Sequence, residues 1–241
     1  MIAHDTKLAI LAVAAGAPAR PINKFNLLGR PGQPGELERH LSTQFDAYER
    51  SLAAKAFEEL VCAGFLQPTL SDIAAPETWF VITESGRDAL KRGALDSLDE
   101  ALLRIDPHLL EIRRGAWAAL GANRPDSLRQ AAHSARELIE QVLKTAAPDE
   151  EVRAQSGFSP DRNSASGITR RNRLRLVMKK YRGDVSDSDL MIAEKASDLV
   201  LAIDVKLQGL SHSRSPPLDV DVRESLEIAE KMLRRLLVGE S

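Results

Sequence analysis

The 241-residue sequence is poor in cysteine and aromatic residues, and it contains no long apolar run. A single cysteine, Cys62, cannot form an internal disulfide or a zinc site built from cysteines, so we expect a reducing compartment. No stretch of about 18 apolar residues occurs, and the first residues are too acidic for a secretory signal. These absences predict a cytoplasmic protein without a membrane span, with Cys62 buried and unreactive.

The sequence also lacks the motifs of several enzyme classes. It has no GxxxxGK[ST] loop, no GxGxxG after a strand and no HExxH helix, which leaves nucleotide hydrolysis, dinucleotide chemistry and zinc hydrolysis without support. We therefore expect no cofactor and no metal ion. The segments GAPARP and GRPGQPG are expected to be loops, and neither contains the lysine of a phosphate-binding loop.

The formal net charge is only −2, which excludes a uniformly basic protein that binds nucleic acid through its whole surface. Residues 162–182 are the exception, because they contain eight Lys or Arg and no acidic residue. We expect this segment to bind RNA or single-stranded nucleic acid. The candidate binding residues are Arg170, Arg171, Arg173, Arg175, Lys179, Lys180 and Arg182. The alternative is a solvated helix face whose charge is offset by acidic residues elsewhere in the fold.

A change in residue pattern near 91–97 predicts two domains. We expect a mainly α protein with a small α+β domain at 1–95 and an all-α helical bundle at 96–241. In the first domain, two β-prone runs, FLQPTL and TWFVIT, follow a helix at 48–64 and precede a helix capped by Thr83. Two further helices are predicted at 6–15 and 36–45, with a long Gly- and Pro-rich loop between them.

The order ELVCAGFLQP and then WFVITESGRDAL resembles a winged-helix domain over about residues 1–93. Winged helices bind DNA, RNA or proteins, so the resemblance alone leaves the function open. A groove-reading helix at 49–63 would offer Arg50 and Lys55 beside three glutamates, and residues 1–95 carry ten basic and eleven acidic residues. We therefore expect this domain to dock a protein partner, and a DNA-binding transcriptional regulator is the alternative.

The second domain is predicted to be helical nearly throughout. Apolar residues at helical spacing predict helices at 97–105, 107–121, 127–147, 168–182, 187–209 and 219–238. Asp126 is expected to cap the longest of these helices. Residues 148–167 are polar and rich in Gly, Ser and Pro, so a flexible loop is expected there.

A histidine beside cations at a helix end, as in LSHSRSPPLD, is suited to RNA cleavage. Such a site moves a proton on the ribose 2′-hydroxyl or the leaving oxygen, while a cation stabilises phosphate charge. Here we assign His212 as acid or base, with Lys206 and Arg214 as phosphate contacts. The alternative is a polar turn in a non-catalytic bundle.

The helix that contains His133, the helix ending in VKLQGLSH and the final helix DVRESLEIAEKMLRRLL resemble the HEPN superfamily over about residues 97–238. Many members are ribonucleases of prokaryotic toxin and antiphage systems, and those that cut RNA carry an arginine a short gap before a histidine. This chain has Lys206 and His212 at those places. Lysine keeps the positive charge but lacks the two parallel N–H donors with which arginine binds a phosphate. The resemblance implies metal-independent RNA cleavage and a homodimer.

Arg129, His133 and Arg136 share one face of the long helix and form a polar ridge, which we expect to line a groove. The alternative is a solvent-facing ridge with Arg136 and Glu140 paired. For the whole chain, the competing hypothesis is a non-enzymatic interaction or dimerisation module of a defence complex. Lysine at position 206 favours that hypothesis.

Overall fold

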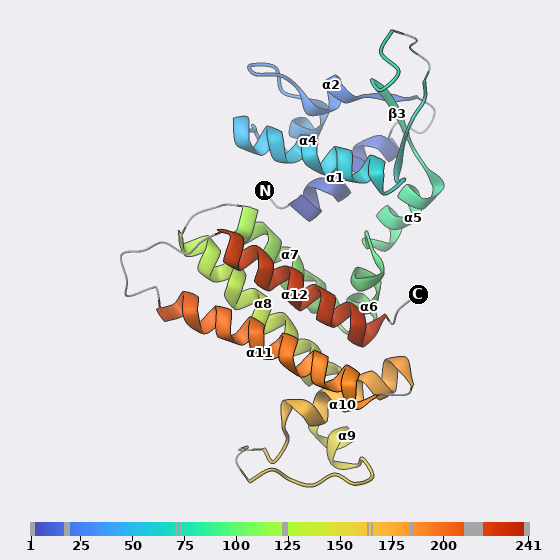
Figure 1. Ribbon diagram of the computed structural model, residues 1–241. Coiled ribbons are helices and arrows are strands. Elements are labelled where there is room, and N and C mark those ends of the chain that lie inside the picture. The colour runs from blue at the N-terminus through green and yellow to red at the C-terminus, as the bar shows by residue number, and fades with distance from the viewer. Residues whose placement is uncertain are drawn as a thin grey trace. The chain divides into compact units, whose positions relative to one another are not determined.

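The computed structural model describes residues 3–16, 20–70, 72, 74–121, 125–162, 164, 166–183, 186–209 and 219–238 (Figure 1). Two compact units divide the chain, residues 1–96 and residues 97–241. Helices dominate both units, and a small antiparallel sheet lies in the first. The fold class is mainly α with a small α+β part, which confirms the prediction from the sequence.

The first unit combines short helices with three short strands. Its elements are α1 (Ala3–Gly16), β1 (Ile22–Asn23), α2 (Lys24–Leu28), α3 (Glu36–His40), α4 (Ala47–Cys62), β2 (Leu66–Pro68), β3 (Trp79–Ile82) and α5 (Glu84–Arg92). The strands form an antiparallel sheet in the order β1-β3-β2, with Ile22 opposite Phe80 and Leu66 opposite Ile82. Helix α1 contacts α4, α5 and β3, so it closes the core of this unit.

Large apolar side chains fill that core. The ring of Phe57, which is fully buried on α4, meets the ring of Phe80 edge-on, with 4.8 Å between the centroids. Ile10 and Leu11 of α1 are fully buried in the same cluster. Each such side chain stabilises the fold by about 1.5–3 kcal/mol relative to an exposed one.

A buried ion pair holds the segment between α2 and α4. Glu38 is only 2% exposed, and its carboxylate accepts hydrogen bonds from the backbone N–H of Gly35 (2.7 Å), the backbone N–H of Phe45 (2.9 Å) and the Arg50 guanidinium (3.0 Å). Arg50 also donates to the carbonyl of Leu28 at 3.2 Å. Burial acts to raise the pKa of Glu38, but these hydrogen bonds and the positive charge outweigh it and hold the pKa below its ordinary value of 4.5.

The second unit is an all-helical bundle. Its elements are α6 (Ser97–Ile105), α7 (Pro107–Gly121), α8 (Pro125–Ala146), α9 (Asp149–Arg153), α10 (Arg170–Arg182), α11 (Asp187–Gly209) and α12 (Asp219–Leu237). Helix α8 contacts α7, α10, α11 and α12, so it is the central helix of the bundle (Figure 1). Figure 1 also shows that the start of α8, the end of α11 and the start of α12 lie at the same end of the bundle.

The apolar stripes predicted from the sequence face this core. On α8 the buried stripe consists of Leu128, Ala132, Ala135, Leu138, Ile139 and Val142. On α12 it consists of Val222, Leu226, Ala229, Leu233 and Leu236, and on α11 of Leu190, Ala193 and Val200. Helical periodicity therefore located the inward faces of α8 and α12 correctly, and that of α11 as far as Val200; Ile203 and Leu207, also expected on that face, lie outside the described side chains.

Two predicted loops contain regular structure. The segment 16–35 includes β1 and α2, and the segment 148–167 begins with α9. These elements are only two or five residues long, too short to show a hydrophobic period in the sequence. The prediction of one flexible loop over 148–167 therefore needs correction at its start, where α9 lies.

Two smaller expectations also need correction. Helix α8 begins at Pro125, which suits the first helical position, so Asp126 lies inside the first turn and pairs with Arg129 at 2.7 Å. Cys62 is exposed at the end of α4, not buried. By contrast, Thr83 caps α5 as predicted, since its hydroxyl accepts the N–H of Gly86 at 3.1 Å.

Candidate nucleic-acid interface

The basic segment folds as helix α10. Thr169 caps the helix, because its hydroxyl accepts the backbone N–H of Asn172 at 3.2 Å while the Asn172 side chain accepts the N–H of Thr169 at 2.9 Å. Leu174, Val177 and Met178 are fully buried against the bundle. The seven cations of α10 therefore occupy the remaining positions around the helix, and they divide into three groups; Arg162 precedes the helix.

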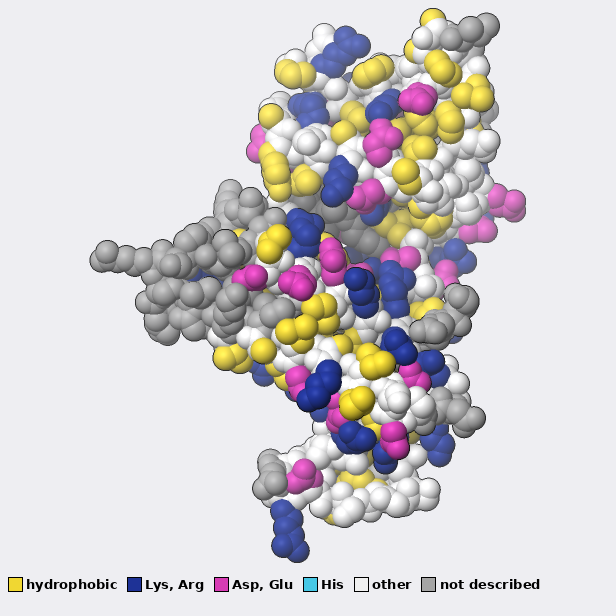
Figure 2. Space-filling model, viewed as in Figure 1, with side chains coloured by type: hydrophobic (Ala, Val, Ile, Leu, Met, Phe, Trp, Pro, Cys, Tyr) yellow, Lys and Arg dark blue, Asp and Glu magenta, His cyan; other side chains and the backbone are white. Residues whose placement is uncertain are grey.

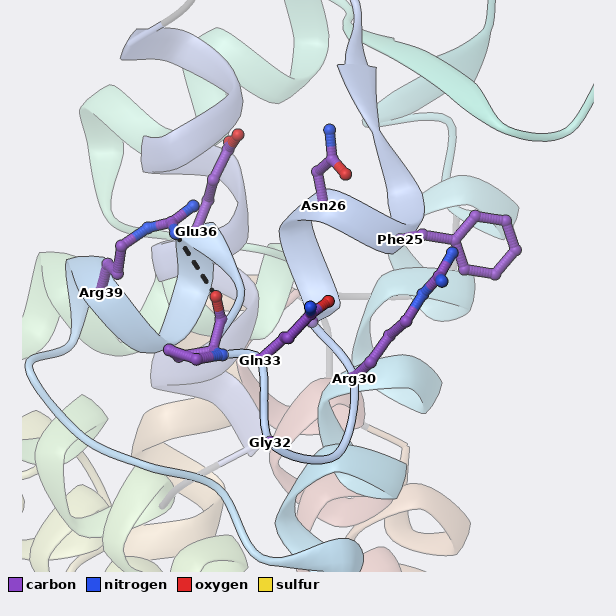
Figure 3. Close-up of a pocket in the computed structure, with 9 residues that line it drawn as sticks. Phe25, Asn26, Arg30, Gly32, Gln33, Glu36 and Arg39 are labelled. Carbon is purple, nitrogen blue, oxygen red and sulfur yellow. Dashed lines mark hydrogen bonds between the residues drawn. The ribbon is translucent and has the colours of Figure 1, made fainter.

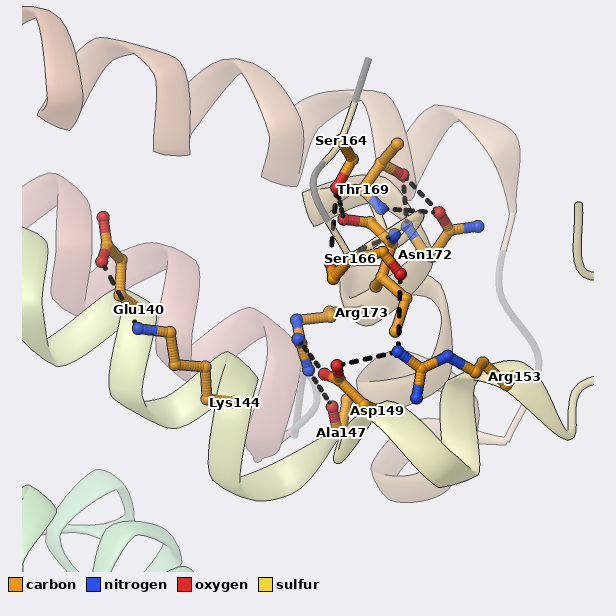
Figure 4. Close-up of polar contacts among 11 residues, drawn as sticks. Glu140, Lys144, Ala147, Asp149, Arg153, Ser164, Ser166, Thr169, Asn172 and Arg173 are labelled. Carbon is orange, nitrogen blue, oxygen red and sulfur yellow. Dashed lines mark hydrogen bonds and ion pairs between the residues drawn. The ribbon is translucent and has the colours of Figure 1, made fainter. Parts of the chain in front are cut away.

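The first group consists of two cations, Arg173 and Lys180, that hold α10 against the end of α8 and the start of α9; Figure 4 shows the contacts of Arg173. Arg173 donates to the carbonyl of Ala147 and to the carboxylate of Asp149, and its side chain is only 16% exposed. Lys180, one full heptad later, pairs with Glu151 at 3.3 Å and reaches the carbonyl of Ala146 at 3.4 Å. Both cations donate hydrogen bonds to carbonyl oxygens at the C-terminal end of α8, which is the negative end of the helix dipole.

The contact with Arg173 changes the pKa of Asp149. The hydrogen bond from Arg173 holds the pKa of Asp149 below its ordinary value of 3.8, against a smaller opposing effect of burial. Arg153 adds to the lowering, because its guanidinium lies 3.2 Å from the other carboxylate oxygen. Arg173 is thus committed to the fold, and so it is a poor candidate for a phosphate contact.

The second group is a single cation, Arg170, whose guanidinium lies 3.6 Å from the carboxylate of Asp198 on α11. This pair links the first turn of α10 to α11. Because Asp198 is more than half exposed, the contact is weakened by water, and such pairs contribute at most about 1 kcal/mol.

The third group forms an outward row along α10. Its members recur at three or four residues and therefore share one face: Arg171, Arg175, Lys179 and Arg182. The first three are exposed, whereas Arg182 is only partly exposed and its Nη1 is buried. We call this set the α10 row. Its backbone length is about 16 Å at 1.5 Å per residue.

Acidic residues of α11 lie beside part of the α10 row. Arg171 pairs with Glu194 at 2.5 Å, and Arg175 lies 3.7 Å from Asp187, which is itself almost fully exposed. Figure 2 shows the same mixture of dark blue cations and magenta acids on the visible face of the bundle. Lys179 is exposed and makes no ion pair with the part of the chain that the structure describes.

The polar ridge predicted on α8 lies on the surface. His133 is exposed, Arg136 pairs with Glu140 at 2.8 Å, and Arg129 pairs with Asp126. The i and i+4 pair that the sequence offered as an alternative is therefore present.

The predicted catalytic residues lie largely beyond the described part of the chain. Lys206 belongs to α11, but its side chain is not among the described ones, and His212 and Arg214 lie outside the described residues altogether. The flanking helices are described, and the end of α11 and the start of α12 lie beside the start of α8 (Figure 1). The ridge residues Arg129 and His133 belong to that part of α8.

A buried polar cluster joins three helices of the bundle, and sequence reasoning missed it. Arg113 of α7 donates to Asp99 of α6 and, through two nitrogens at 2.7 and 2.9 Å, to Glu230 of α12. The indole N–H of Trp117 donates to the same Glu230 carboxylate at 2.5 Å. Asp99 is fully buried. From the sequence alone, a charged residue in an amphipathic helix is expected to face solvent. Arg113, Asp99 and Glu230 lie far apart in the sequence, and only the fold brings them together.

Helix α4, which would enter the groove of DNA in a winged-helix protein, has most of its charged side chains in ion pairs. On α4, Arg50 is committed to the buried Glu38, and Glu58 and Glu59 pair with Lys24 and Lys7. The α4 surface therefore has little positive charge to offer to phosphates.

Neither a metal cluster nor a membrane span is found among the described residues. No group of three or more His, Cys, Asp or Glu side chains there is placed to hold a metal ion. No helix in the same residues is long and apolar enough to cross a membrane.

Comparison with protein families decides where the chain belongs. The family described as predicted pPIWI-associating nuclease matches residues 101–236, which is more than half of the chain. The chain belongs to this family. The matched region of this pPIWI-associating nuclease family member contains α7 to α11 and nearly all of α12, and with them the α10 row and the ridge. No curated protein and no solved structure shows significant similarity to the chain.

Proposed function

We propose that this protein is a nuclease that cuts RNA without a metal ion, as part of a prokaryotic defence system that includes a pPIWI protein. The observation that carries the proposal is the family match over residues 101–236, because that family is described as nucleases that associate with pPIWI. The resemblance to the HEPN superfamily supplies the reaction type. The described geometry supplies two groups of cations that support the proposal: the α10 row, beside the start of α11, and the ridge on α8, near the end of α11.

In the proposed reaction, His212 acts on the proton of the ribose 2′-hydroxyl or of the leaving oxygen. The 2′-oxygen attacks the adjacent phosphorus, the bond from phosphorus to the 5′-oxygen breaks, and that oxygen takes up a proton. The products are a 2′,3′-cyclic phosphate and a 5′-hydroxyl, so atoms and protons balance. Lys206 and Arg214 would stabilise the negative charge that develops on the phosphate oxygens.

The α10 row would guide the RNA. Lys179 and Arg175 are exposed, and the row is long enough to meet several phosphates. The ridge residues Arg129 and His133 would meet the RNA near the predicted catalytic turn, because α8 begins where α11 ends (Figure 1). Arg173 and Lys180 would contribute only through the fold.

We also propose that the protein acts as a homodimer through α11. This helix exposes an apolar face formed by Met191, Ile192, Leu199 and Val205. Lys195 and Asp198 lie within that face, 3.7 Å apart and well exposed. If a second copy packs antiparallel against it, each Lys195 lies opposite Asp198 of the partner copy, so the face is complementary to itself.

A second candidate is a non-catalytic module that binds a partner or nucleic acid within the same kind of system. The ion pairs of Arg170, Arg171, Arg173 and Lys180 with acidic residues reduce the positive charge available to RNA, which favours a module that binds a protein partner. Lysine in place of arginine at position 206 also favours the non-catalytic module.

Cleavage of single-stranded RNA in the presence of a chelator separates the two candidates. A nuclease of the proposed kind cuts RNA, and His212→Ala abolishes cutting while the protein stays folded. A binding module retains RNA in a salt-dependent way and leaves it intact in both proteins. Circular dichroism of the variant provides the control for folding.

A further inference from the structure

A polar pocket of about 600 Å³ lies within the first unit, between α2, the turn that follows it and α3 (Figure 3). One side of the pocket is formed by Phe25 with Arg30 alongside, and the other by Glu36 and Arg39 (Figure 3). None of these residues falls in the region matched by the nuclease family. The function proposed above therefore does not account for this pocket.

The turn at the base of the pocket is rigid. Arg30 and Gln33 exchange two backbone hydrogen bonds of 2.9 Å, and between them Pro31 precedes Gly32, whose φ is +79°. Proline followed by a glycine with positive φ is the sequence that a type II turn requires. A Cβ on Gly35 would lie only 2.3 Å from the carbonyl of Leu27, so the backbone is tightly packed here. The pocket is thus preformed.

Within the described part of the chain, the charged side chains of the pocket have no ionic partner. Arg30, Glu36 and Arg39 make no ion pair with any residue that the structure describes, and Arg39 only donates a long hydrogen bond of 3.4 Å to the carbonyl of Pro34. This differs from α4, where the charged side chains are largely paired. Two unpaired arginines on opposite sides of a concavity are suited to bind an anion.

The pocket also presents an aromatic face. Phe25 is 54% exposed, which is unusual for a phenylalanine, and the guanidinium carbon of Arg30 lies 5.7 Å from its ring centroid. An exposed ring beside an arginine is the arrangement on which unpaired bases stack. The side-chain amides of Asn26 and Gln33, which both line the pocket, offer donors and acceptors to the edge of a base.

We propose that this pocket binds one unpaired nucleotide of a single-stranded nucleic acid. The base stacks on Phe25, and Arg30 and Arg39 contact the adjacent phosphates. The Glu36 carboxylate can accept a hydrogen bond from the exocyclic amino group of a base, an interaction that the carboxylates of an acidic peptide cannot make. A volume of about 600 Å³ is adequate for a nucleotide.

The test measures binding of a fluorescein-labelled 2′-O-methyl oligoribonucleotide to the full-length protein by fluorescence anisotropy at low salt. The 2′-O-methyl group prevents attack on the phosphate, so the result does not depend on whether the protein is a nuclease. Loss of one stacking contact weakens single-strand binding roughly 5- to 150-fold. We expect Phe25→Ala to fall in that range and Phe25→Trp to retain the affinity of the wild type.

The matched control is Tyr48→Ala, which removes another aromatic side chain that is 50% exposed in the same unit but outside the pocket. We expect its affinity to stay close to that of the wild type. Unchanged binding by Phe25→Ala, an equal loss in Tyr48→Ala, or no binding by the wild type would each overturn the proposal. Lys179→Ala reports separately on the α10 row, so failure of that surface is distinguished from failure of this pocket.

Discussion

Arg173 reaches back along the chain to Asp149, and this contact fixes helix α10 against the start of α9. It also removes one of the seven candidate phosphate ligands from the set that RNA could use. Arg173 therefore belongs to the cations that stabilise the fold, and not to those available to a ligand.

This pair predicts a pH dependence of stability. Because the pKa of Asp149 is lowered in the folded protein, its ionised form stabilises the fold fully above the ordinary value of 3.8, and this contribution disappears as the pH falls below it. Urea unfolding of the wild type and Asp149→Asn should differ at pH 6 and converge toward pH 2. A difference that persists unchanged at pH 2 would contradict this account.

The division of the α10 cations predicts two kinds of variant. Lys179→Ala should lower RNA affinity and reduce the slope of log K against log salt by about 0.7, the value for one phosphate contact on a single strand. Arg173→Ala should instead lower the unfolding temperature. Equal effects of the two variants on the salt slope would show that the division is wrong.

Breaking the buried pair of Glu38 and Arg50 should destabilise the first unit. Arg50→Ala leaves the carboxylate of Glu38 buried with one fewer donor, and loss of a partner from a buried pair costs about 3 kcal/mol. Chemical denaturation of Arg50→Ala measures this loss. Lys55→Ala, which removes an exposed cation from the same helix, is the control and should change the free energy of unfolding by less than about 0.5 kcal/mol.

The apolar face of α11 predicts the oligomeric state. Leu199→Glu places a charge in the centre of the proposed dimer contact and should convert a dimer to a monomer in light scattering after gel filtration. Lys195→Asp should weaken the dimer as well, and combining it with Asp198→Lys should restore it. A wild-type protein that is monomeric at micromolar concentration would refute the contact.

The sequence predicted most of the fold because its long helices carry a clear apolar period. The stripe from Leu128 to Val142 is one example, and the cap at Thr83 is another. The short elements β1, α2 and α9 were missed, since a few residues show no period and their positions depend on tertiary contacts.

The candidate site was less predictable from sequence. The basic character of residues 162–182 was evident, but not that Arg173 and Lys180 face Asp149 and Glu151, which belong to a different helix. The pocket beside Phe25 was read as a loop, because a Gly- and Pro-rich sequence does not reveal the concavity that its turns create. His212 and its neighbours remain a prediction from sequence.

The most direct test of the central claim is cleavage of single-stranded RNA by the wild type and by His212→Ala in the presence of a chelator. We expect the wild type to release products with a 2′,3′-cyclic phosphate, and His212→Ala to bind the RNA without cutting it. Intact RNA after incubation with the wild type, or equal cutting by both proteins, would contradict the assignment of a metal-independent ribonuclease.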